Sequence, residues 1–285
     1  MASPLIQTNE LLALYQNGTN HTVLIDASAG PDALENYKKQ HLEGAIFVNL
    51  ETQLAEVGDN AANGGRHPLP TLDGLSHTLA HLGITPETYV VVYDDKQGSN
   101  AAARFWWMLT AIGHQHIYVL NGGLQAAQKA GFPISIDVHV PDYAPPYPIS
   151  EWILPQASLA DVQQASATGT STIIDVRDAD RYAGLREPID LIAGHIPQAI
   201  NIPFTHNLKA DGTFKDKDEL GALYAPILHT VDADTVIVHC GSGVTACHTL
   251  LAIAVAGLPI PELYVGSWSE WSRHQLPMIT HNLNA

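Results

Sequence analysis

The chain has few cysteines, few basic residues and no long apolar run, and each shortage excludes a class of protein. Among its 285 residues are two cysteines, and 13 Lys and Arg against 29 Asp and Glu give a formal net charge of −16. Binding of nucleic acid needs clustered basic side chains, so we expect no nucleic-acid partner. No apolar stretch approaches the roughly 20 residues that span a bilayer, so we expect no membrane partner.

The cysteine content also bears on the compartment. Cys240 and Cys247 lie seven positions apart, which is unlike a disulfide framework and indicates a reducing environment. The opening segment MASPLIQTNELLALYQ lacks the basic and apolar regions of a secretory signal. We therefore expect a cytoplasmic protein.

Apolar runs of three to six residues alternate with helical stretches along the chain. Short, nearly all-apolar strands with intervening helices predict an α/β fold of parallel sheets covered on both faces. In such folds ligands bind beyond the carboxyl ends of the strands. The predicted strands are 22–27, 89–93, 117–120, 172–176, 235–239 and 263–265, and the clearest predicted helices are 101–112 and 244–256.

The two halves of the sequence repeat each other. TVLIDAS in the first half aligns with TIIDVRD in the second, and TYVVVYDD aligns with DTVIVHCG. This alignment predicts a duplicated domain in which Asp94 occupies the place of Cys240. The Pro-rich stretch 138–152 is the predicted linker, and it separates a domain at 1–137 from a second at 153–285.

Cys240 occupies the most informative position in the chain. It ends an apolar strand and is followed by a short loop that opens a helix, within VIVHCGSGVTACHTLLAIAVAG. Inward backbone N–H groups and the helix dipole would stabilise an anion there, and the thiolate is the nucleophilic form of cysteine. Gly241 and Gly243 indicate a loop whose backbone approaches another group closely, which a buried structural cysteine seldom needs.

The loop CGSGVTA resembles the active-site loop of the 3-mercaptopyruvate sulfurtransferases, within the rhodanese superfamily. Thiosulfate sulfurtransferases typically carry basic residues where Gly241 and Ser242 stand. The resemblance covers essentially the whole chain and implies two tandem rhodanese-like domains, the first inactive because the Asp94 carboxylate cannot carry a sulfane sulfur. Further matching segments are IIDVRDADRYAG, AGHIPQAINIPF and YVGSWSEW in the second half, and GGRHPLP, DDKQGSNAAARFWW and NGGL in the first.

The resemblance implies a two-step sulfur transfer through a Cys240 persulfide, with 3-mercaptopyruvate as donor and pyruvate as product. A thiol or cyanide then accepts the sulfur, and the family suggests thioredoxin or a low-molecular-weight thiol. No metal or organic cofactor is implied. The loop N–H groups would hold the persulfide anion, and these belong to Gly241, Ser242, Gly243, Val244 and Thr245.

Other positions match the family's proton relay and anion-binding groups. Ser242, His67 and Glu51 match a relay of Ser, His and Asp, with Glu51 in place of Asp. Arg181 matches the substrate-binding arginine, whose guanidinium suits a carboxylate. Ile189 stands where a second arginine is usual, and Arg186 is the candidate for the missing cation. Arg66 is a further cationic candidate.

Three other functions would also use a cysteine in such a loop. The first is a thiosulfate sulfurtransferase, which would use the same persulfide and release sulfite. The second is a Cys-dependent phosphatase, which is excluded because such enzymes need an arginine where Ala246 stands. The third is a non-enzymatic persulfide carrier. The roles of Trp268 and Trp271 stay open between pocket lining and core packing.

Overall fold

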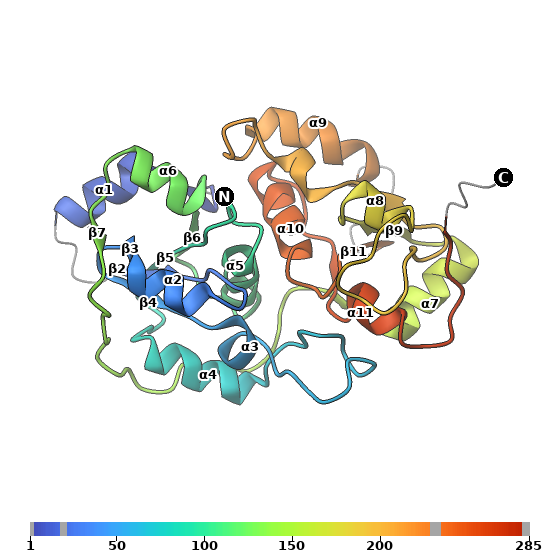
Figure 1. Cartoon of the computed structure of the whole chain (residues 1–285), viewed down its shortest axis with the longest axis horizontal. Coiled ribbons are helices and arrows are strands. Elements are labelled where there is room, and N and C mark those ends of the chain that lie inside the picture. The colour runs from blue at the N-terminus through green and yellow to red at the C-terminus, as the bar shows by residue number, and fades with distance from the viewer. Residues whose placement is uncertain (1–2, 18–21, 229–234, 281–285) are drawn as a thin grey trace. The chain divides into compact units, whose positions relative to one another are not determined.

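The computed structural model describes residues 3–17, 22–228 and 235–280, and the chain forms two compact units (Figure 1). Each unit contains a five-stranded, fully parallel sheet with flanking helices, which confirms the predicted fold class. The first unit comprises Met1–Glu56, Pro70–Ile153 and Leu208–Phe214, and the second comprises Val57–Leu69, Leu154–Asn207 and Lys215–Ala285.

The first unit has its longest strands at the centre of the sheet. In sheet order the strands are β1 (Leu5–Ile6), β6 (Ile117–Leu120), β5 (Tyr89–Tyr93), β2 (Thr22–Asp26) and β4 (Ala45–Phe47). A small antiparallel pair joins β3 (His41–Leu42) to β7 (Ile134–Ser135). The helices are α1 (Thr8–Gln16), α2 (Ala33–Lys39), α3 (Leu50–Gln53), α4 (Leu72–His81), α5 (Ala101–Ala111) and α6 (Gly123–Lys129).

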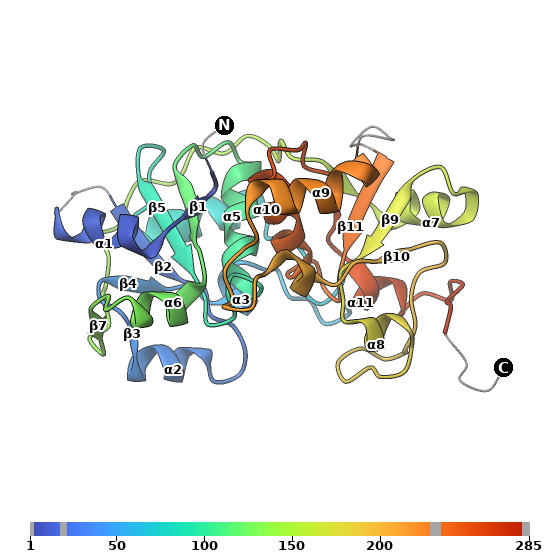
Figure 2. The ribbon, with the colours of Figure 1, turned by 90° about the horizontal axis from the view of Figure 1, so that it is seen from above.

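The second unit repeats this arrangement, and Figure 2 shows β9 beside β10 and β11. In sheet order its strands are β10 (Ile200–Asn201), β9 (Thr172–Asp175), β11 (Val236–His239), β12 (Glu262–Tyr264) and β8 (Gln156–Ala157). Its helical segments are α7 (Leu159–Thr168), α8 (Ala179–Tyr182), the 3₁₀ turn η1 (Phe204–Asn207), α9 (Lys217–Leu228), α10 (Ala246–Val255) and α11 (Ser267–Trp271).

The two sheets have the same topology. Taken in chain order, strands one to five of each sheet occupy the same places, so β5 in the first unit corresponds to β11 in the second. Asp94 follows β5 and Cys240 follows β11 directly. The structure therefore places Asp94 and Cys240 at equivalent positions of a duplicated domain.

Burial explains why the strands and central helices consist mainly of apolar residues. The central strands and helices α5 and α10 are buried along most of their length, because both faces of each parallel sheet are covered. The predicted strands and the two named helices agree with the structure to within two residues at each end. Trp268 and Trp271 are 0% and 1% exposed and belong to the core of the second unit.

The units are not two uninterrupted halves of the chain. Residues 57–69 come from the first half of the sequence but belong to the second unit, and 208–214 make the reverse exchange. The predicted linker 138–152 forms neither helix nor strand and lies within the first unit. Within the described ranges, no helix is long and apolar enough to cross a membrane.

Candidate active site

Cys240 lies directly after β11 in the second unit and is 3% exposed. The first turn of α11 holds its backbone on both sides. The Cys240 N–H donates to Ser267 Oγ at 3.2 Å, and its carbonyl accepts from the Trp268 N–H at 3.1 Å. The Gly241 carbonyl accepts from the Ser269 N–H at 2.8 Å. Three hydrogen bonds therefore fix the start of the loop to α11.

Gly243 meets the backbone that precedes α11. Its φ is +73°, and a Cβ at this position would lie 2.4 Å from the Val265 carbonyl oxygen. Only glycine combines this left-handed conformation with so close an approach. Gly241 differs, because its φ is not positive and the three atoms nearest to a Cβ there would be guanidinium nitrogens at 3.4 to 3.5 Å.

In the equivalent loop of the first unit, backbone N–H groups hold the side-chain carboxylate of Asp94. Asp94 Oδ1 accepts from the N–H groups of Lys96 and Gly98, both at 2.8 Å. Its Oδ2 accepts from the N–H groups of Asn100 at 3.0 Å and Ala102 at 3.1 Å. Burial raises the pKa of Asp94 to about 6, although these backbone hydrogen bonds oppose the rise. The loop after the central strand thus directs four amides at one carboxylate.

Ser242 and His67 form a hydrogen-bonded pair in the second unit. Ser242 Oγ lies 2.8 Å from His67 Nδ1, and Ser242 is 5% exposed. His67 comes from segment 57–69, which the chain contributes to this unit from its first half. Glu51 belongs to the first unit, where it is an exposed residue of α3 whose N–H donates to Asn49 Oδ1.

Two arginines of the second unit converge on Gly241. The Cβ position of Gly241 lies 3.4 Å from Arg181 Nη2 and 3.5 Å from Arg66 Nη2. The guanidinium group of Arg181 is held by Glu187, because its Nε and Nη2 donate to the two carboxylate oxygens of Glu187 at 3.1 and 2.8 Å. Arg186 is exposed. The structure therefore brings Arg66, rather than Arg186, beside Arg181 at the loop.

Asp190 lies among the arginines beside the Cys240 loop, and no sequence pattern predicted it there. Its side chain is 0% exposed and accepts hydrogen bonds from Arg66 Nη1 and, at 3.3 Å, Arg181 Nη2. Arg273 Nη1 lies 3.5 Å away and also donates to the Ser269 carbonyl at 2.6 Å. Arg66 and Asp190 lie 124 positions apart in the sequence. The only local signal for Asp190 is that it is an acidic residue close to Arg181 and Arg186, which the sequence had already singled out.

A buried ionic cluster supports the strand ends beneath the loop. Arg177 Nη2 donates to Asp175 Oδ2 at 2.6 Å, and its guanidinium carbon lies 4.7 Å from the Trp268 ring centroid. Burial opposes ionisation of Asp175, but the charge and hydrogen bonds of Arg177 hold its pKa below the ordinary value. Burial lowers the pKa of His239, whose Nδ1 lies 3.1 Å from the Cys240 carbonyl.

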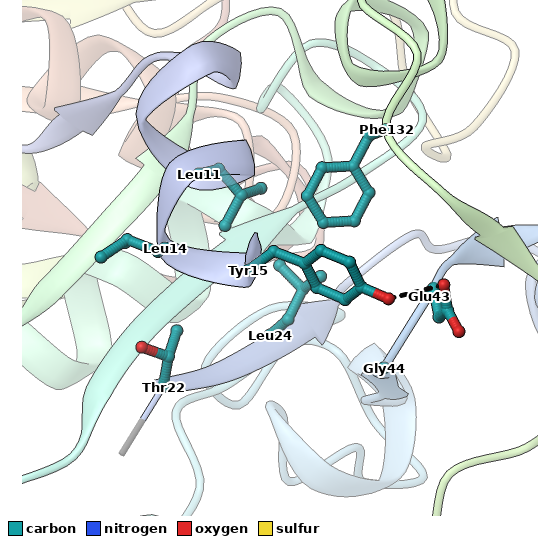
Figure 3. Close-up of a pocket in the computed structure, with 8 residues that line it drawn as sticks. All are labelled: Leu11, Leu14, Tyr15, Thr22, Leu24, Glu43, Gly44 and Phe132. Atoms are coloured by element: carbon teal, nitrogen blue, oxygen red, sulfur yellow. Dashed lines mark hydrogen bonds between the residues drawn. The ribbon is translucent and has the colours of Figure 1, made fainter. Parts of the chain in front are cut away.

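Each unit also has a cavity that Cys240 does not line. The cavity of the first unit has a volume of about 160 Å³ and is mainly apolar, with the Tyr15 hydroxyl donating to Glu43 Oε2 at 2.7 Å (Figure 3). It is lined by Leu11, Leu14, Tyr15, Thr22, Leu24, Glu43, Gly44 and Phe132. An opening of about 540 Å³ in the second unit lies against Arg273 and is lined by Asn60, Ala62, Leu191, Ile192, Ser272, Arg273, His274, Gln275 and Met278.

Among the residues that the structure describes, metal-ligating side chains do not gather at Cys240 or at another place. In the part of the chain that the structure describes, no group of three or more His, Cys, Asp or Glu residues is placed to hold a metal ion. Neither Cys240 nor Cys247 is in a disulfide, and Cys247 Sγ donates to the Gly243 carbonyl at 3.3 Å.

Comparison with known proteins gives consistent matches along the chain. The model of the rhodanese-like domain family matches residues 7–130 and 158–274. A Mycobacterium tuberculosis protein named as a thiosulfate sulfurtransferase is 38% identical over 274 residues, which are 94% of this chain and 93% of that protein. A Pseudomonas aeruginosa protein named as a 3-mercaptopyruvate sulfurtransferase is 38% identical over 239 residues, 82% of each chain.

Solved structures agree with this result. The structure of 3-mercaptopyruvate sulfurtransferase from Leishmania major has a TM-score of 0.79 and 29% identity, and the match covers 95% of this chain and 74% of that one. Two relatives of equal identity thus carry names with different sulfur donors. Overall similarity alone therefore does not select the donor.

Proposed function

This chain belongs to the rhodanese-like domain family and is a sulfurtransferase, and we propose that it moves sulfur from 3-mercaptopyruvate to a thiol or cyanide through a Cys240 persulfide. The observation that carries the proposal is the loop after β11, which presents a nearly buried thiol where the equivalent loop of the first unit directs four amides at Asp94. A thiol at such a position is suited to nucleophilic catalysis.

In the first step, Cys240 Sγ attacks the sulfur of 3-mercaptopyruvate. A new S–S bond forms while the C–S bond of the donor breaks, and the electron pair of that bond stays on carbon. The resulting enolate takes up a proton and leaves as pyruvate. Sulfur on the enzyme is thereby oxidised to the persulfide level, and the donor carbon is reduced to a methyl group.

In the second step, an acceptor thiolate attacks the outer sulfur of the persulfide. The S–S bond to Cys240 breaks, its electron pair returns to Sγ as the thiolate, and the acceptor leaves as a persulfide. Cyanide accepts the same sulfur atom as thiocyanate. We propose thioredoxin or a low-molecular-weight thiol as the acceptor in a cytoplasmic setting, which the lack of a disulfide between Cys240 and Cys247 supports.

The loop amides have the role of an oxyanion hole in this mechanism. The N–H groups of Gly241, Ser242, Gly243, Val244 and Thr245 stabilise the outer sulfur as an anion. Support comes from the first unit, where N–H groups at two, four, six and eight residues after Asp94 bind its carboxylate. The left-handed conformation of Gly243 supports a sharp turn of the chain in the Cys240 loop, as anion-binding loops require.

Proton movement is assigned to Ser242 and His67. The 2.8 Å contact between Ser242 Oγ and His67 Nδ1 provides a route by which the imidazole delivers a proton to the departing enolate. The family pattern predicts Glu51 as a further acidic group of the relay, and no step is assigned to it.

The cationic groups beside the loop bind the donor's charge. We assign the carboxylate of 3-mercaptopyruvate to Arg181 and Arg66, whose guanidinium groups both reach Gly241. Arg186 is assigned an outer, charge-attracting role that fits its exposure. The same two guanidinium groups also suit thiosulfate, so thiosulfate sulfurtransferase is the second candidate function.

The proposal is tested by measuring kcat/KM for 3-mercaptopyruvate and for thiosulfate with one thiol acceptor. We expect a preference for 3-mercaptopyruvate of tenfold or more, which corresponds to about 1.4 kcal/mol of differential transition-state binding. Mass spectrometry of the donor-treated protein should show one added sulfur on Cys240, and Cys240→Ser should show neither persulfide nor turnover. A reversed preference selects thiosulfate, and activity surviving in Cys240→Ser overturns the mechanism.

A further inference from the structure

Asp190 lies at the centre of the charged groups that reach the Cys240 loop. Its carboxylate is 0% exposed and contacts the guanidinium groups of Arg66, Arg181 and Arg273. A buried carboxylate is stable only when it is paired, and three arginines provide that pairing here. Two of these arginines, Arg66 and Arg181, also approach the Cβ position of Gly241 within 3.5 Å.

The charge of the cluster is nearly balanced. Arg66, Arg177, Arg181 and Arg273 face the carboxylates of Asp175, Glu187 and Asp190, which leaves a single positive charge in excess. Glu187 and Asp190 both accept from Arg181 Nη2, at 2.8 and 3.3 Å. The two guanidinium groups at Gly241 are therefore rigidly held, and much of their charge is already compensated.

We propose that Asp190 is a specificity-determining residue that limits the positive charge at the Cys240 loop and so favours monoanionic sulfur donors over dianionic ones. This inference rests on the proposed function. At neutral pH 3-mercaptopyruvate carries one negative charge and thiosulfate carries two. Any added positive charge at the site therefore stabilises bound thiosulfate about twice as strongly as bound 3-mercaptopyruvate.

The test compares the two donors in Asp190→Asn, which preserves the shape of the side chain and removes one negative charge. We expect the ratio of kcat/KM for thiosulfate to that for 3-mercaptopyruvate to rise about tenfold. The matched control is Asp180→Asn, which removes the same formal charge from an exposed residue of α8 and should leave the ratio within about twofold.

A second pair of variants guards against misfolding of Asp190→Asn. Arg273 contacts Asp190, whereas Arg66 and Arg181 are the arginines at Gly241. Arg273→Gln should therefore shift the ratio in the opposite direction, towards 3-mercaptopyruvate. The double variant Asp190→Asn/Arg273→Gln restores the charge balance and should return the ratio towards that of the wild type.

The outcomes separate this inference from the proposed function. If the wild type forms no persulfide with either donor, the proposed function fails. If the wild type forms the persulfide but the ratio stays unchanged in Arg273→Gln and in folded Asp190→Asn, the role of Asp190 is overturned and the sulfurtransferase remains. A ratio that also rises tenfold in Asp180→Asn would show a general charge effect and would likewise overturn it.

Discussion

Asp94 and Cys240 follow equivalent central strands of the two units, but one side chain is a carboxylate and the other a thiol. The Asp94 carboxylate accepts four backbone hydrogen bonds and fills its loop permanently. Cys240 places no carboxylate in its loop, and we propose that the amides there are left for an anion formed during the reaction. The two units therefore share a strand order and differ in the side chain that follows the central strand.

Protonation of Asp94 is expected to stabilise the fold. Burial raises its pKa from the ordinary value of 3.8 to about 6, so the folded protein binds this proton more tightly than the unfolded chain does. The stabilisation is complete below about pH 4 and is lost as the pH rises through about 6. The free energy of unfolding of wild type relative to Asp94→Asn should therefore be up to about 3 kcal/mol larger at pH 4 than at pH 7.

Urea unfolding of both proteins across this pH range measures the difference directly. Using the difference between two variants removes the contributions of the other titrating groups, such as Asp175, because these are common to both. A difference that does not change with pH would contradict the raised pKa.

At the level of elements, the backbone around Cys240 is held by four neighbours, which are β11, the loop that follows it, α10 and α11. The first turn of α11 bonds the backbone of Cys240 and Gly241, and Ser267 adopts a left-handed conformation with φ of +53° to supply its Oγ. Such a conformation is unfavourable for a residue with a Cβ. The Cys240 N–H bond and the second bond from Ser267 Oγ to the Tyr264 carbonyl offset that cost.

The two glycines of the loop should respond differently to alanine. In Gly243→Ala the added Cβ meets the Val265 carbonyl oxygen at 2.4 Å, and φ is +73°. We expect this variant to lose about 2 kcal/mol of unfolding free energy and most persulfide formation. Gly241→Ala is the matched control, since its Cβ meets only the ends of Arg66 and Arg181 at ordinary contact distance.

Gly241→Ala should stay within about 1 kcal/mol of the wild type. Denaturant unfolding gives the stabilities, and mass spectrometry after exposure to the donor gives the persulfide yield. Equal losses in the two variants would show that the close approach at Gly243 does not govern the loop.

At the scale of the whole molecule, the chain exchanges segments between its units. Segment 57–69 contributes Arg66 to Asp190, His67 to Ser242, and the Gly64 N–H to Glu270 Oε1 at 2.8 Å. The second unit is therefore incomplete when it is cut from the chain as one continuous piece.

A fragment spanning residues 154–285 should consequently be inactive and less stable than the same unit in the full chain. Without Arg66 the buried Asp190 loses one of its three cationic partners, and such a loss is expected to cost about 3 kcal/mol. Circular dichroism on heating and persulfide formation measure the two effects. Full activity in the isolated fragment would show that segment 57–69 is dispensable for sulfur transfer.

The fold class, the duplication and the position of Cys240 could be predicted from the residue order alone. Parallel strands buried on both faces must be continuous apolar runs, and a loop that binds anions needs glycine and follows a strand, so both features are local and visible in the residue order. The family resemblance followed from the same segments, and the family and fold are confirmed.

Only the tertiary structure decided which charged groups meet at the loop. Arg66 and Asp190 are 124 positions apart, and the exchange of segment 57–69 brings them together. Trp268 and Trp271 could line a pocket or fill the core, and packing of α11 assigned them to the core. Ion pairs and packing between distant segments depend on how the chain folds back on itself, and local spacing carries no record of that.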